Sequence, residues 1–158
     1  MNSSPVAERV AMTPAQRPDS KPGAQPTDRK AGEQEPARIL VVEDDFLIAM
    51  QTESALAAAG FHVIGTAATA EEAVALAEKE RPVLAVMDIR LASKRDGIDA
   101  ARELYEALDI RCIFATAHDD ESTRQRAAPY APLGWLAKPY TTASLVALVT
   151  AAVRGSKD

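Results

Sequence analysis

Short apolar runs alternate along the chain with stretches in which apolar residues recur every three or four positions. The runs are rich in aliphatic and β-branched residues, which predicts strands, and the three-to-four-residue recurrence predicts amphipathic helices. Strands are predicted over residues 38–43, 61–67, 82–88, 111–116 and 134–138, and helices over residues 45–59, 70–79, 96–108, 121–128 and 141–153. The pattern therefore predicts five consecutive strand–helix units after residue 36.

Two of the predicted helices carry boundary signals. Asp45 opens the first helix, where a short carboxylate can accept a hydrogen bond from a free backbone N–H. Thr69, followed three residues later by Glu72, has the spacing of a capping box. Gly60 follows the first helix at the position where glycine commonly ends one.

The strand sequences ILVV and VLAVM are apolar throughout. Such strands are typical of parallel sheets that helices cover on both faces. Strands that alternate with helices also favour parallel pairing, because each crossover needs a long connection. We therefore expect an α/β fold with a doubly wound, five-stranded parallel sheet. Aromatic residues make up only 4% of the chain, so its core should be mostly aliphatic.

Residues 1–36 differ in composition from the rest. They contain six of the ten prolines and no isoleucine, leucine or aromatic residue, so they cannot build a core. We expect a disordered, Pro-rich N-terminal tail at residues 1–36 and one folded domain at residues 37–158. The tail is interpreted either as a solvated segment or as a docking segment.

Charge and cysteine content exclude several classes of function. The net charge of −5 provides no basic field for nucleic acid or an anionic membrane surface. Cys112 is the only cysteine and is expected to be an inert core thiol, which favours a reducing, cytoplasmic location. No apolar run approaches the ~18 residues of a membrane span.

Polar residues stand at the ends of four predicted strands. Glu43 and Asp44 end the first, Asp88 the third, Thr116 the fourth and Lys138 the fifth. Because the carboxyl ends of parallel strands meet at one edge of a doubly wound sheet, we expect these side chains to lie together. Clustered carboxylates suit a hard cation such as Mg²⁺, and a lysine and a hydroxyl can bind phosphoryl oxygens.

Each of these residues also has an ordinary interpretation when it is taken alone. Asp88 could decorate a loop, Lys138 could be solvated, and Thr116 could end its strand without a role. His118, with the two aspartates that follow it, is interpreted as a polar helix start rather than as a metal site. A haloacid-dehalogenase-type phosphohydrolase would need a second acid two residues after Asp88, where Arg90 stands.

Four segments occur in the order that marks one known family: ILVVEDD, VMDIRL, FAT and LAKPY. Taken together, residues 38–153 resemble the receiver domain of bacterial two-component response regulators. The resemblance implies a flavodoxin-like sheet with strand order 2-1-3-4-5 and helices on both faces. It also implies that Asp88 is the phosphoacceptor.

The same resemblance implies roles for the other site residues. Asp44 and Asp88 would be Mg²⁺ ligands, with Glu43 acting through water and the backbone carbonyl of Arg90 completing the set. A second group would bind the phosphoryl group and transmit the signal: Thr116, Ala117 and Lys138 as phosphoryl-binding residues, and Thr116 with Trp135 as the switch pair.

The expected function is that of a single-domain response regulator, because only five residues follow Val153. It would accept a phosphoryl group from a sensor histidine kinase or phosphotransfer protein on Asp88. It would then change its affinity for a downstream protein or for a second copy of the chain, through a surface on the fourth helix, fifth strand and fifth helix. The alternatives are a phosphate shuttle or sink, an interaction module that works without phosphorylation, and a phosphatase acting only on its own aspartyl phosphate.

Overall fold

The computed structural model describes residues 35–156. Its strands are β1 (Arg38–Val42), β2 (His62–Ala67), β3 (Leu84–Asp88), β4 (Arg111–Thr116) and β5 (Gly134–Ala137). Its helices are α3 (Phe46–Ala58), α4 (Ala70–Glu80), α5 (Gly97–Leu108), α6 (Glu121–Ala127) and α7 (Thr142–Ser156), with a 3-10 turn, η3 (Ala128–Tyr130), after α6. The tail predicted at residues 1–36 falls almost entirely outside the described residues.

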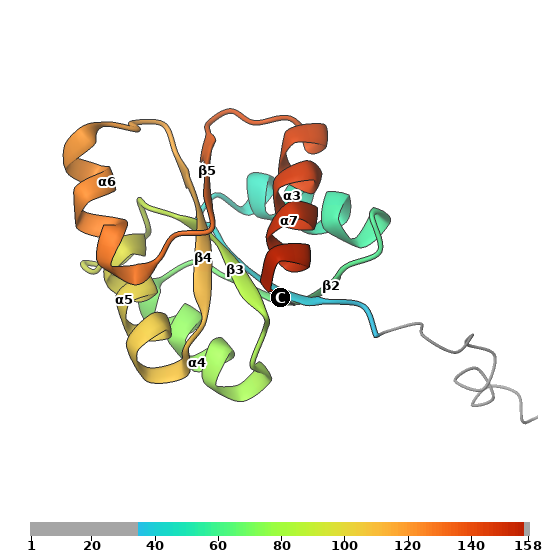
Figure 1. Cartoon of the computed structure of the whole chain (residues 1–158), viewed down its shortest axis with the longest axis horizontal. Helices are drawn as coiled ribbons and strands as arrows, with labels where there is room; N and C mark the ends of the chain where they lie inside the picture. Colours follow the sequence, from blue (N-terminus) through green and yellow to red (C-terminus); the bar gives the residue numbers. More distant parts are fainter. Residues whose placement is uncertain (1–34, 157–158) are drawn as a thin grey trace, which may run out of the picture. The chain divides into compact units, whose positions relative to one another are not determined.

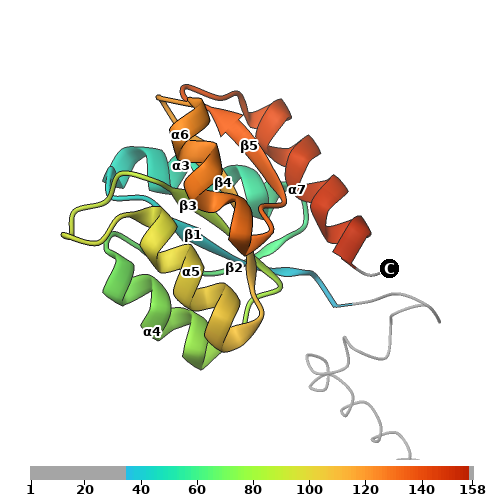
Figure 2. The ribbon, with the colours of Figure 1, turned by 60° about the vertical axis from the view of Figure 1, so that its left-hand side comes forward.

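The five strands form one parallel sheet in the order β2-β1-β3-β4-β5. Figure 1 shows α3 and α7 on one face of the sheet and α4, α5 and α6 on the other, and the turned view in Figure 2 agrees. The predicted fold class and strand order are therefore confirmed. All ten predicted strands and helices are present, with ends that lie within three residues of the predicted ones.

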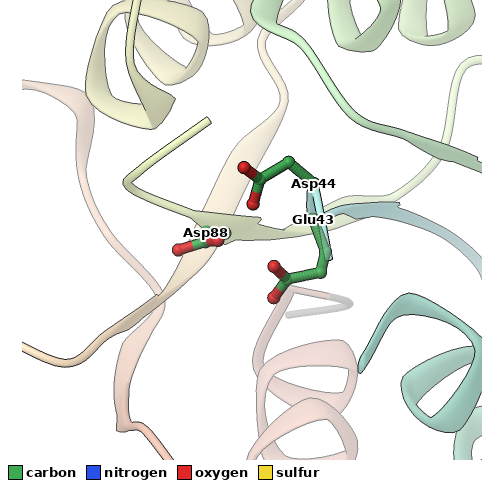
Figure 3. A group of neighbouring side chains, drawn as sticks. All are labelled: Glu43, Asp44 and Asp88. Carbon is green, nitrogen blue, oxygen red and sulfur yellow. The ribbon is translucent and has the colours of Figure 1, made fainter. Parts of the chain in front are cut away.

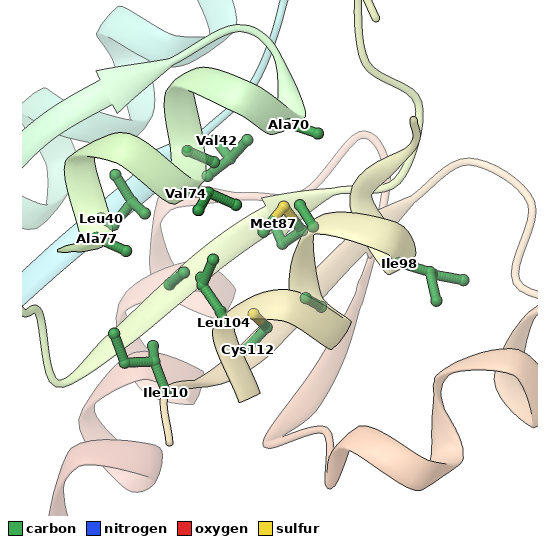
Figure 4. Packing of buried hydrophobic residues seen from close by; sticks show 14 of the residues in the cluster. Leu40, Val42, Ala70, Val74, Ala77, Met87, Ile98, Leu104, Ile110 and Cys112 are labelled. Carbon is green, nitrogen blue, oxygen red and sulfur yellow. The ribbon is translucent and has the colours of Figure 1, made fainter. Parts of the chain in front are cut away.

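The sheet separates two layers of core side chains. Alternate residues of β1 point to opposite faces, so that Leu40 packs beneath α4 and α5 while Ile39 packs beneath α3 and α7. Figure 4 shows the first layer, where Leu40, Met87 and Leu104 meet between the sheet and its helices. Burial on both faces explains why the strand sequences lack the alternation of a half-exposed sheet.

Local hydrogen bonds fix the helix ends that position the site. Asp45 caps α3 by accepting a hydrogen bond from the Ile48 backbone N–H at 3.1 Å. Gly60 has a φ of +97°, in the left-handed region that glycine tolerates best, and it ends α3 as predicted. The cap at Asp45 and the turn at Gly60 thus fix the first and last residues of α3.

The predicted capping box at Thr69 is only half formed. The Thr69 hydroxyl accepts from the Glu72 N–H at 3.1 Å, as expected. The Glu72 carboxylate, however, accepts from the Ala68 N–H at 2.8 Å instead of from Thr69. Its side chain therefore caps the loop one residue earlier than the motif predicts.

Within the part of the chain that the structure describes, no helix has the length and apolar character needed to cross a membrane.

Candidate functional site

Four strand ends bring the predicted site residues to one edge of the sheet. Asp88 is the last residue of β3 and pairs in register with Ala115, so that Thr116 follows directly on β4. Thr116 pairs in turn with Ala137, which places Lys138 just beyond the end of β5. Glu43 follows the last residue of β1. The parallel register therefore gathers these side chains without any long loop.

Three acidic side chains form a cluster at this edge. Carboxylate oxygens of Glu43, Asp44 and Asp88 lie within 4.8 Å of one another. Figure 3 shows that Glu43 and Asp44 leave the end of β1 in different directions, with Asp88 beside them on β3. Glu43 and Asp88 are each only 5% exposed, whereas Asp44 is open to solvent. Mutual repulsion and burial make such a cluster costly unless a cation balances it.

Lys138 supplies part of that balance. Its Nζ lies 3.0 Å from Glu43 Oε1 and 3.3 Å from Asp88 Oδ2. Its backbone N–H donates to the Thr116 carbonyl at 2.9 Å, which holds the residue against the end of β4. Partial burial acts to lower the pKa of Lys138, but the two carboxylates outweigh burial and raise that pKa. The ammonium therefore stays charged beside the acids.

Burial shifts the pKa of Glu43 in the opposite direction from that of Lys138. Burial raises the pKa of the Glu43 carboxyl, and the neighbouring Asp88 carboxylate raises that pKa further. The Asp45 N–H at 3.1 Å and the Lys138 ammonium stabilise the charged form only in part. Three carboxyl groups thus face one ammonium, which leaves an excess of negative charge.

The donor set suits a magnesium ion. Oxygen ligands from carboxylates are those that Mg²⁺ prefers, and the ion usually keeps several waters, so that one exposed and two buried acids suffice. Arg90 follows Asp88 closely, and its backbone N–H donates to Asp88 Oδ1 at 3.3 Å. The residues present therefore fit the predicted metal, and the Arg90 carbonyl stays a prediction as a ligand.

The acids open onto a cleft of about 650 Å³. Its other lining residues come from the ends of β3, β4 and β5 and from the starts of α3 and α6: Asp45, Ile48, Ile89, Arg90, Thr116, Ala117, His118, Asp120, Thr123 and Lys138. Thr116 is 7% exposed, and its Oγ1 accepts a hydrogen bond from the His118 N–H at 3.0 Å. The cleft thus combines acids, an ammonium and a hydroxyl on one rim.

Trp135 does not line this cleft. The indole is half-buried on β5 and stacks on Phe114, with ring centroids 5.1 Å apart and planes inclined by 29°. The Arg124 guanidinium carbon lies 4.7 Å above its ring. The structure therefore brings together all the predicted site residues except Trp135, which lies on β5 beside Phe114 and outside the cleft.

Gly97 is a site residue that the sequence patterns did not reveal. A Cβ at this position would lie 2.1 Å from the Asp88 carbonyl oxygen and 2.8 Å from the Ile89 Cα. Its N–H donates to the Ile89 carbonyl at 2.6 Å. Glycine therefore lets α5 begin directly against the backbone of Asp88. A glycine at a helix start is a weak signal, since only the packing shows what it approaches.

A second unpredicted contact braces the Lys138 loop. The hydroxyls of Thr52 on α3 and Tyr140 lie 2.8 Å apart, and Thr52 is 3% exposed. Tyr140 stands two residues after Lys138, so the contact ties this loop to α3. Burial raises the pKa of the Tyr140 hydroxyl, which favours its protonated form, and either of the two hydroxyls can donate this hydrogen bond.

Comparisons with known proteins agree on one family. The model of the response regulator receiver domain matches residues 39–150. The chain is 34% identical over 118 residues to the transcriptional regulatory protein PdtaR of Mycobacterium tuberculosis, an alignment that covers 75% of this chain and 57% of the relative. It is 38% identical over 117 residues to the phyllosphere-induced regulator PhyR of Methylorubrum extorquens, covering 73% of this chain and 43% of PhyR. The chain thus spans about half the length of the curated relatives it matches.

Solved structures give the same result. The signal receiver domain of a modulated diguanylate cyclase from Desulfovibrio desulfuricans superposes with a TM-score of 0.71 at 34% identity, covering 77% of this chain and 97% of that one. The signal receiver domain of the response regulator NarL from Mycobacterium tuberculosis superposes with a TM-score of 0.70 at 26% identity, covering 77% of this chain and 99% of that one.

Proposed function

The chain belongs to the response regulator receiver domain family, and we propose that it accepts a phosphoryl group on Asp88 from a sensor histidine kinase or phosphotransfer protein. One observation carries the proposal. The buried Asp88 carboxylate ends β3 with the Lys138 ammonium at 3.3 Å and two further carboxylates beside it. A nucleophile, a fixed cation and a cation-binding set thus meet at one point.

The proposed step is a transfer between two protein side chains. An oxygen of the Asp88 carboxylate forms a bond to phosphorus, and the phosphorus–nitrogen bond to the donor imidazole breaks. The electron pair of that bond stays on the imidazole nitrogen, and an aspartyl phosphate remains on this chain. The reaction needs no further reactant, because the phosphorus–nitrogen bond of the donor is itself reactive enough to form the acyl phosphate.

Asp44 and Asp88 would hold Mg²⁺, with Glu43 through water and the Arg90 carbonyl. When bound, Mg²⁺ supplies positive charge against the phosphoryl oxygens. Lys138 contributes a second charge from the other side of Asp88, 3.3 Å from Oδ2. Lys138 also contacts the Glu43 carboxylate at 3.0 Å. A phosphoryl oxygen on Asp88 would therefore replace this carboxylate as a partner of the Lys138 ammonium.

The remaining phosphoryl oxygens would be bound from the end of β4. The Thr116 hydroxyl lies on the cleft rim, and the Ala117 N–H would donate beside it. Thr116 Oγ1 accepts from the His118 N–H, so its own hydrogen is available for a phosphoryl oxygen. A hydroxyl that moves toward the phosphoryl group would draw the loop after β4 with it.

We infer that the output is a change in affinity for a protein partner. The surface formed by α6, β5 and α7 would bind a downstream protein or a second copy, because Trp135 and the loop after Thr116 adjoin it. The relatives named as regulators are about twice as long as the matched region, so the output of this chain is proposed from its own site. The donors named here act in the cytoplasm, where we place the chain.

Phosphorylation with acetyl phosphate and Mg²⁺, followed by intact-mass measurement, tests the proposal. The wild-type protein and Glu53→Gln should each gain the mass of one phosphoryl group, because Glu53 is an exposed acid of α3 that does not line the cleft. Asp88→Asn should gain none. Equal labelling of Asp88→Asn would remove Asp88 from the mechanism and favour an interaction module that works without phosphorylation.

A further inference from the structure

Thr52 is a buried polar residue that the proposed transfer does not use. Among the described residues, four polar or charged side chains are buried, and the other three, Glu43, Asp88 and Thr116, belong to the site. Thr52 lies on the same buried stripe of α3 as Leu56, where an apolar side chain would suit the core. A buried hydroxyl destabilises a fold unless it is hydrogen-bonded, so the chain has to supply Thr52 with a partner.

That partner is the hydroxyl of Tyr140, 2.8 Å from Thr52 Oγ1. Tyr140 belongs to the Lys138 loop, residues 138–141, which joins β5 to α7. The backbone N–H of Lys138 ties this loop to the Thr116 carbonyl on β4, and its ammonium reaches the acids. The remaining hydrogen bonds described for the loop stay within it and α7. Of all those described, only the bond of Tyr140 therefore ties the loop to α3.

A cavity of about 580 Å³ lies beside the Lys138 loop, between α3 and α7, which share one face of the sheet (Figure 1). Thr52, Pro139 and Tyr140 are among the residues that line it. Lys138 lines this second cavity as well as the cleft of the acids, so it borders open space on two sides. Close packing therefore does not fix the loop on this side, and the hydrogen bond to α3 does.

The hydrogen bond between Thr52 and Tyr140 also connects elements that carry opposite charges. Glu43 stands three residues before the start of α3, and Lys138 stands two residues before Tyr140. The Lys138 ammonium lies 3.0 Å from Glu43 Oε1 and 3.3 Å from Asp88 Oδ2. The attraction between charges falls with their separation, so a shift of the loop away from α3 would weaken both pairs.

We propose that Thr52 and Tyr140 are positioning residues that hold Lys138 in the cleft. In the state described here, their hydrogen bond keeps the Lys138 loop against α3 and the ammonium beside Glu43 and Asp88. Without this bond the loop samples positions in which Lys138 faces the second cavity, and the acids lose their neighbouring positive charge. This inference rests on the proposed function, because Lys138 would bind a phosphoryl oxygen in that transfer.

Displacement of Lys138 should change Mg²⁺ binding and phosphoryl transfer in opposite directions. The ammonium repels a cation held by the same acids, so Mg²⁺ should bind more tightly when Lys138 leaves the cleft. Phosphoryl transfer should slow, because that charge no longer faces the phosphoryl oxygens. A hydrogen bond of ordinary net strength shifts an equilibrium by about fivefold, which limits both changes. General damage to the site would instead weaken metal binding and transfer together.

Tyr140→Phe and Thr52→Val each remove one hydroxyl from this hydrogen bond. At saturating Mg²⁺, both variants should be phosphorylated by acetyl phosphate about two- to fivefold more slowly than wild type. Their Kd for Mg²⁺, from isothermal titration calorimetry, should fall by up to about fivefold. Thr52→Ser keeps a hydroxyl and should retain both wild-type values. The matched control, Tyr105→Phe, removes a hydroxyl from α5, outside the cleft and the second cavity, and should also retain both values.

A second comparison tests whether the pair acts through Lys138. Lys138→Met should bind Mg²⁺ more tightly than wild type, and adding Tyr140→Phe to it should leave that affinity unchanged. A further change on adding Tyr140→Phe would overturn the proposal. Wild-type rates and affinities in Tyr140→Phe and Thr52→Val, or slower transfer with weaker Mg²⁺ binding, would overturn the positioning role and leave the proposed function intact. A wild-type protein that gains no phosphoryl group overturns the proposed function and this inference with it.

Discussion

The substitution Gly97→Ala tests whether the site requires the close approach of the α5 start to the backbone of Asp88. The added Cβ would lie 2.1 Å from the Asp88 carbonyl oxygen, whereas ordinary contacts begin near 3.4 Å. The backbone around Asp88 or the start of α5 must therefore move by about 1.3 Å, the difference between these two distances. The atoms in the way are backbone atoms, which cannot swing aside as a flexible side chain would.

The size of the effect follows from two opposing terms. Overpacking a buried position costs roughly 1–3 kcal/mol, and a backbone clash belongs at the upper end of that range. Replacing glycine by alanine in a helix returns about 1 kcal/mol through helix propensity. The free energy of unfolding should thus fall by about 2 kcal/mol, which lowers the urea midpoint by about 1 M at a typical slope of about 2 kcal/mol per molar.

Urea unfolding followed by circular dichroism measures this loss, and Gly155→Ala is its control. Gly155 lies in α7, and a Cβ there would have no atom within 4 Å. Gly155→Ala should leave the midpoint unchanged or raise it, and should keep normal phosphorylation. Gly97→Ala should also slow phosphorylation by acetyl phosphate, because the backbone of the acceptor is displaced. Equal midpoints and equal labelling rates for the two variants would refute this reasoning.

Three further predictions follow from the acids, the thiol and the arginines. At 100 times its Kd, Mg²⁺ should add about 2.7 kcal/mol to the free energy of unfolding of wild type, which a thermal melt shows as a higher melting temperature, and Asp44→Asn should lose most of this gain. Burial raises the pKa of the Cys112 thiol to about 12, so Ellman's reagent at pH 8 should react only after unfolding, and rapid labelling of the folded chain would contradict this. Burial acts to raise the pKa of Asp96, but the Arg126 guanidinium outweighs it and holds that pKa below the ordinary 3.8. The pair therefore stabilises the fold above about pH 4 and loses this effect as the pH falls through the lowered pKa, so the stability difference between wild type and Arg126→Met should shrink in acid rather than stay constant.

The layout of the fold follows from local patterns in the sequence. Apolar runs such as ILVV are buried on both faces of the sheet, and this requirement leaves few other arrangements for five strand–helix units. The same reasoning places strand ends together, which is why the contact of Lys138 with Glu43 could be anticipated across 95 residues. Helix ends were predictable where a cap acts within three residues, as at Asp45.

The contacts that escaped prediction depend on how separate elements pack. The approach of Gly97 to Asp88 is set by the angle at which α5 meets β3, and no local pattern encodes that angle. The position of Arg124 over Trp135 likewise depends on the placement of α6 against β5. An arginine on a short, polar helix looks like any solvated charge until its neighbours are known.

Chemical trapping of the phosphorylated residue tests the central claim most directly. Borohydride reduces an aspartyl phosphate to homoserine, so treatment of the protein after incubation with acetyl phosphate and Mg²⁺ marks the acceptor for peptide mass spectrometry. We expect homoserine at position 88, in amounts that fall when Mg²⁺ is removed. Homoserine at another acid with Asp88 unmodified, or no homoserine in a protein that remains folded, would contradict the account.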